Sequence, residues 1–106
     1  VGDGIEIEAL SHQQPWEMPY EGHLVDTMVQ SLLAEDPDAI VAPYLMSGGT
    51  DGKAWQKLGV RCFGFAPLQL PTDLDFVAMF HGVDERVPTD SLQFGCRVLD
   101  RFLDQA

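Results

Sequence analysis

The chain has 106 residues, and its 17 Asp and Glu against six Lys and Arg give a formal net charge of −11. So acidic a surface repels phosphate backbones and anionic lipid headgroups, which argues against nucleic-acid and membrane partners. A hydrophobic fraction of 45% is too high for a disordered chain, and the length predicts one domain at most.

The two cysteines, Cys62 and Cys96, are too few for a disulfide scaffold and lack the spacing of a metal site. We interpret them as reduced thiols, which predicts a cytoplasmic location, with a single bridge as the alternative. The chain begins at Val1 without an initiator Met or a signal-peptide pattern. We therefore expect it to be a piece of a longer parent protein.

The N-terminal half predicts a strand, a linker, a helix and a second strand. Apolar and polar residues alternate over 5–9, as in a strand with one solvated face. Residues 11–20 contain two prolines and are predicted to be a linker. Apolar side chains recur with helical spacing over 22–35, and Pro37 ends that helix. The short apolar run 39–42 is typical of a strand buried on both faces.

The C-terminal half continues this alternation. A turn at 46–52 leads into a short helix that Gly59 ends, and a second buried strand is predicted over 60–65. After a loop at 67–75, a further apolar run spans 76–80. The order of strands and helices predicts an α/β fold, with a sheet of three to four strands flanked by helices.

The last predicted helix begins near residue 90, with Thr89 or Asp90 as its capping residue. Its apolar residues follow the spacing of an amphipathic helix. We expect these side chains to form the buried stripe: Leu92, Cys96, Leu99, Phe102 and Leu103.

The first candidate site is the glycine-rich turn SGGTDG at residues 47–52, between a predicted strand and a helix. Ligands of open α/β sheets bind at the carboxyl ends of strands. The tandem glycines Gly48 and Gly49 let backbone N–H groups approach an anion such as a substrate carboxylate. The alternative is a simple tight turn in which Thr50 or Asp51 caps the helix.

The second candidate site is His81, at the end of the third predicted buried strand. A histidine there can be a metal ligand or an acid/base, with Asp84 or Glu85 as partner for its other ring nitrogen. The alternative is a histidine in a solvated surface loop. We expect the remaining histidines, His12 and His23, on the surface, and both tryptophans, Trp16 and Trp55, as packing anchors.

Together, the motifs SGGTDGKAW, GFAP and FHGVDERV, followed by an amphipathic helix, resemble the C-terminal part of a known enzyme family. These are the two-zinc aminoacylase, dipeptidase and glutamate-carboxypeptidase-type metallopeptidases, which include succinyl-diaminopimelate desuccinylase. The resemblance covers nearly the whole chain. It implies that residues 1–20 are the end of the lid domain and the crossover, and that residues 21–106 are the C-terminal portion of the catalytic domain.

The resemblance also implies the role of each site residue. His81 corresponds to a zinc ligand, whereas Gly48, Gly49 and Thr50 correspond to a turn that binds the substrate's free carboxylate. The parent enzyme would hold two zinc ions and hydrolyse an amide bond in a dipeptide or an N-acyl amino acid. One histidine is equally compatible with cobalt or manganese. No catalytic residue of the family's motifs has a counterpart in this chain.

Because a zinc site needs at least three protein ligands, we expect the 106-residue chain alone neither to hold zinc tightly nor to hydrolyse amides. We also expect a homo-oligomer, since strands taken out of a larger sheet leave open edges and an uncovered apolar face. One alternative is a non-enzymatic acidic α/β module that mediates protein association, and another is a catalytically inactive family member. A His-x-Asp pair encoded upstream, followed by adjacent acidic residues, would distinguish the enzyme from both.

Overall fold

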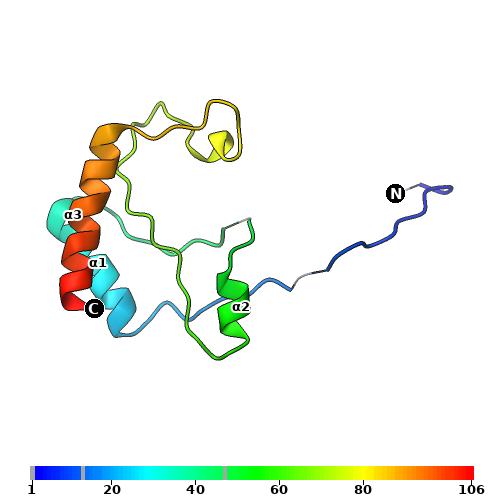
Figure 1. Ribbon diagram of the computed structural model, residues 1–106, viewed down its shortest axis with the longest axis horizontal. Helices are drawn as coiled ribbons and strands as arrows, with labels where there is room; N and C mark the ends of the chain where they lie inside the picture. Colours follow the sequence, from blue (N-terminus) through cyan, green and yellow to red (C-terminus); the bar gives the residue numbers. More distant parts are fainter. Residues whose placement is uncertain (1, 13, 47) are drawn as a thin grey trace.

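Helices form the regular structure of the computed structural model, which describes residues 2–12, 14–46 and 48–106. The elements are α1 (His23–Glu35), α2 (Gly52–Gln56), the 3-10 helix η1 (Val77–Met79) and α3 (Thr89–Gln105). Figure 1 shows α1 and α3 packed together, with long irregular segments connecting them to α2 and η1. No helix in these ranges is both long and apolar enough to cross a membrane.

The two long helices confirm the helical predictions. α1 follows Gly22, whose φ of 94° favours glycine, and its last turn is closed by the Asp36 N–H, which donates to the Leu32 carbonyl just before Pro37. α3 begins after Pro88. Because no side chain caps its first turn, the predicted capping role of Thr89 or Asp90 is wrong.

The predicted α/β fold class is wrong, because the described residues contain no strand. The segments 5–9, 39–42 and 60–65 are irregular, and the fourth predicted strand, 76–80, contains η1. A strand requires a hydrogen-bonded neighbour, whereas the sequence pattern indicates only that a segment is apolar or alternating. Ile40, which we expected to be buried, is 96% exposed.

The core lies between α1 and α3. Val25 and Met28 of α1 and Phe94 and Val98 of α3 are its buried apolar side chains. Burying apolar surface stabilises a fold by about 25 cal/mol for each Å² of that surface removed from water. The helical prediction therefore holds because each helix supplies the surface that covers the other.

A connecting segment completes this core by packing on α3. The Ser91 hydroxyl is buried and donates to the Gln69 carbonyl at 2.6 Å. A Cβ built on Gly95 would lie 2.7 Å from the Pro67 carbonyl oxygen, so only glycine allows this close approach. The Gln69 side chain in turn donates to an Asp36 carboxylate oxygen at 3.2 Å, which connects the segment to the end of α1.

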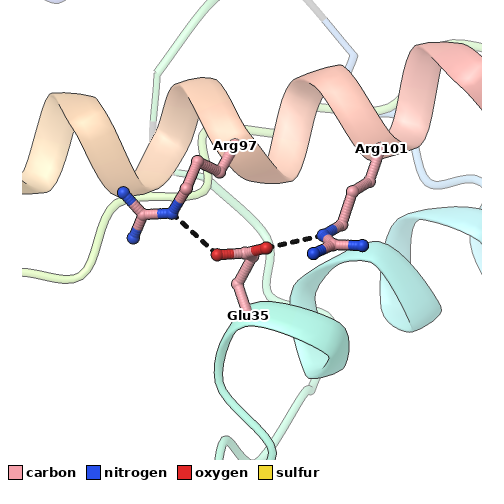
Figure 2. Close-up of polar contacts among 3 residues, drawn as sticks. All are labelled: Glu35, Arg97 and Arg101. Carbon is pink, nitrogen blue, oxygen red and sulfur yellow. Dashed lines mark hydrogen bonds and ion pairs between the residues drawn. The ribbon is translucent and has the colours of Figure 1, made fainter.

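Two arginines of α3 form ion pairs with the last residue of α1 (Figure 2). Arg97 Nε donates to Glu35 Oε2 at 2.7 Å, and Arg101 Nε donates to Glu35 Oε1 at 2.5 Å. The Glu35 side chain is only 12% exposed. Hydrogen bonds from Arg97, then Arg101, and the charges of both guanidinium groups lower the pKa of the Glu35 carboxyl.

The buried face of α3 is not the predicted stripe. The helix buries Ser91, Phe94, Gly95 and Val98, so the expected face is displaced by about one residue. Most of the predicted stripe is exposed instead: Leu92, Cys96, Leu99 and Leu103. Cys96 and the half-buried Cys62 are both free thiols. α3 therefore carries two apolar faces, of which only one is covered.

Candidate functional site

The glycine-rich turn lies directly before α2. Ser47 lies outside the described residues, whereas Gly48, Gly49 and Thr50 are described and exposed. A Cβ built on Gly49 would meet no atom within 4 Å, so the backbone there opens onto free space. Asp51 is the residue at the N-terminus of α2 and makes no side-chain capping bond, which removes helix capping as its role.

Gly52 brings the turn against the N-terminal linker. A Cβ at this position would lie 3.0 Å from Trp16 Cζ2, 3.1 Å from Thr50 Oγ1 and 3.3 Å from Cys62 Cβ. All three distances are tighter than ordinary van der Waals contact, so a larger residue would push these groups apart. The Trp16 ring and the Thr50 hydroxyl therefore face the same small space.

A cavity of about 710 Å³ lies between the linker and α2. Its lining residues are Gln14, Pro15, Trp16, Glu17, Lys53, Ala54, Gln56 and Lys57. We expected Trp16 and Trp55 to be packing anchors, but Trp16 is only half-buried and Trp55 is 55% exposed. The cavity itself was not predicted from the sequence. The only sequence signal for it is a cluster of cations after the turn in an otherwise acidic chain.

His81 lies in a tight reversal of the chain after η1. Its φ of 59° is in the left-handed region, which is uncommon outside glycine and is concentrated at functional sites. The His81 N–H donates to Glu85 Oε2 at 3.1 Å, and the Gly82 N–H donates to the Met79 carbonyl at 2.9 Å. These bonds fix the backbone of the loop and leave the imidazole exposed.

The acidic neighbours of His81 serve the loop itself. The Glu85 carboxylate accepts the His81 backbone N–H, and the Asp84 carbonyl accepts a bond from the Arg86 guanidinium at 2.9 Å. The predicted contact of either residue with a ring nitrogen is not among these bonds. The structure brings Thr50 next to Trp16, whereas α2 and η1 lie apart (Figure 1).

The described residues do not form a zinc centre by themselves. Within residues 2–12, 14–46 and 48–106, no group of three or more His, Cys, Asp or Glu is arranged to hold a metal ion. Zinc sites in proteins use three or four protein ligands. His81 therefore offers a single donor, and no catalytic step can be assigned to a metal held by this part of the chain alone.

Comparison with protein families gives a match over nearly the whole chain. A family model described as peptidase family M20/M25/M40 matches residues 2–105. The match includes both the glycine-rich turn and the His81 loop. Comparisons with curated proteins and with solved structures gave no match.

Proposed function

The chain belongs to peptidase family M20/M25/M40, and on that basis we propose that it is the C-terminal portion of a zinc-dependent amidohydrolase. The parent enzyme cleaves an amide bond next to a free carboxylate, in a dipeptide or an N-acyl amino acid. The observation that supports this function is the family match over residues 2–105, which spans both candidate motifs. Family membership favours this enzyme over a non-enzymatic interaction module.

In this proposal the glycine-rich turn holds the free carboxylate of the substrate. Open space at Gly49 leaves room for an anion close to the backbone N–H groups. Thr50 adds an exposed hydroxyl donor, whose Oγ1 would lie 3.1 Å from a Cβ built on Gly52. Backbone and hydroxyl donors of this kind suit a carboxylate without adding a counter-charge.

His81 is the ligand that this chain contributes to the metal centre. Its backbone is held by Glu85 while its ring is exposed, so the imidazole is accessible. The remaining ligands come from other segments of the parent enzyme, because no three His, Cys, Asp or Glu among the described residues are grouped to hold a metal ion. The 106-residue chain alone is therefore inactive, and zinc, cobalt and manganese all remain compatible with one histidine.

The decisive experiment replaces His81 in the parent enzyme. Loss of a metal ligand removes both metal affinity and the charge that stabilises the transition state, so His81→Ala lowers kcat/KM at least about a hundredfold. Metal content per chain, measured by mass spectrometry, falls with it. The matched control is His12→Ala, because His12 is an exposed histidine whose ring bonds to the Gln14 side chain. Near-normal turnover at full metal content in His81→Ala contradicts the assignment.

A second substitution tests the carboxylate site separately from the metal. Thr50→Val keeps the volume that packs against Gly52 but removes the hydroxyl. If this hydroxyl binds the substrate equally in the ground and transition states, KM rises severalfold while kcat changes little. Steady-state kinetics on an N-acyl amino acid gives both constants. An unchanged KM rejects Thr50 as a carboxylate contact.

A further inference from the structure

The cavity beside the glycine-rich turn combines a flat ring with two cations. Trp16 forms part of the wall from the linker, and Lys53 of α2 and Lys57 directly after α2 line the other side. Glu17 is the one carboxylate among the lining residues, so two cations face one anion. A volume of about 710 Å³ lies within the ordinary range for small-molecule sites, roughly 300–1,000 Å³.

The positive charge of this region stands out against the rest of the chain. Residues 52–72 contain three of the six cations and no acidic residue, although the net charge of the whole chain is −11. Lys53 lies in α2, and Lys57 directly follows it with helical φ and ψ, so their four-residue spacing places both on one face of this turn of helix. A local excess of cations attracts anions and raises their concentration at the surface.

The third cation of this segment has a structural role. The Arg61 guanidinium donates to the Glu21 carbonyl at 2.7 Å and to the Pro19 carbonyl at 3.3 Å, and it lies 5.3 Å from the centre of the Phe63 ring. Arg61 therefore ties the linker to the segment after α2. The linker also contains Trp16, which lines the same cavity as the two lysines.

The cavity lies beside the turn, because Trp16, which lines the cavity, would lie only 3.0 Å from a Cβ built on Gly52 at the end of the turn. We propose that the cavity receives a second, negatively charged group of the substrate, so that the preferred substrates carry an acidic side chain. This inference rests on the proposed function, in which the turn at Gly48–Thr50 holds the first carboxylate. The substrate class is then an acidic dipeptide or an N-acyl acidic amino acid.

Two ligands of the same shape test this inference on the 106-residue chain. N-acetyl-L-glutamate and N-acetyl-L-glutamine share the first carboxylate and differ only in side-chain charge. With two partly exposed lysines, the glutamate ligand binds about fivefold more tightly at low salt. Calorimetry gives the affinities, and the indole N–H signal of Trp16, identified with a Trp16→Phe variant, gives the location. Added salt at about 0.5 M reduces the preference by screening.

Lysine variants assign the preference to the cavity. A Lys53→Gln, Lys57→Gln double variant binds both ligands equally, while Arg86→Gln, which removes an exposed cation outside the cavity, retains the preference. Equal affinities in the wild-type chain, or no binding of either ligand, overturn the inference. If the proposed carboxylate turn is wrong instead, Thr50→Val leaves both affinities unchanged while the glutamate preference still depends on the lysines.

Discussion

The helical pair, α1 with α3, and the segments that contain the predicted site residues differ in how completely this chain surrounds them. In the helical pair Val98 is 0% exposed, and Glu35 binds two arginines of the partner helix. In the site segments Gly48, Thr50 and His81 are exposed. Each helix of the pair therefore finds its packing partner within this chain, whereas the predicted site residues are exposed.

This difference has a consequence for the size of the molecule. The radius of gyration is 17.6 Å, compared with about 13 Å for a compact domain of this length. The excess arises where long segments run outside the helical pair (Figure 1). Substitutions in the helical pair should therefore change stability, and substitutions in the site segments should change binding or catalysis.

The largest stability effect is expected at Gly95. A Cβ there would lie 2.7 Å from the Pro67 carbonyl oxygen, and backbone atoms must move to relieve the clash. Gly95→Ala therefore lowers the free energy of unfolding by about 3 kcal/mol, although alanine favours helix. Urea unfolding followed by far-UV circular dichroism measures the change. Gly64→Ala is the matched control, because a Cβ at Gly64 meets nothing within 4 Å. Equal free energies of unfolding for the two variants would contradict the close packing of Gly95 on Pro67.

The same difference explains which elements could be predicted from the sequence. The spacing over 22–35 specifies α1 locally, and α3 has a similarly local signal. The run 39–42 has an equally clear apolar signal, yet a strand depends on a partner segment that no local pattern identifies. The buried face of α3 was displaced because the helix has apolar residues on two faces, and only packing against α1 and Pro67 selects one.

The candidate site could be predicted only where a motif lies in one short stretch. The glycine-rich turn and His81 were found because their sequence order resembles a known family, and the structure neither assembles them into one site nor tests their roles. The cavity at Trp16 was missed because it forms between the linker and α2, which are separated by more than 30 positions in the sequence. In the sequence its lysines look like ordinary surface residues, because only the folded structure shows the linker opposite them.

A smaller change in the stability of the helical pair is expected when the pH is lowered. Because Arg97 and then Arg101 lower the pKa of Glu35 in the folded chain, this carboxylate stabilises the fold above its unfolded pKa of about 4.5. That contribution is lost as the pH falls below this value and through the folded pKa. Glu35→Gln removes this part of the acid dependence and lowers stability at neutral pH. The readout is the urea midpoint at several pH values, with Glu8→Gln on the exposed N-terminal segment as control.

The smallest effect concerns the uncovered face of α3. The chain exposes 8720 Å², compared with roughly 5,900 Å² for a folded monomer of this mass. Leu92, Leu99 and Leu103 lie along this face, and Leu103 is 72% exposed. We propose that two copies of the chain associate through it, because apolar faces of this kind are seldom left in contact with water.

Leu99→Gln tests this association without disturbing the buried face of α3. Removing one partly buried leucine from the interface weakens self-association about fivefold, measured by sedimentation at low micromolar concentration. Val83→Gln is the control, because Val83 is fully exposed in the His81 loop. The net charge of −11 opposes association, so added salt strengthens it by screening the repulsion between copies. A wild-type chain that sediments as a monomer at every salt concentration contradicts the proposal, and the uncovered face of α3 would then be tolerated in water, just as the site segments are.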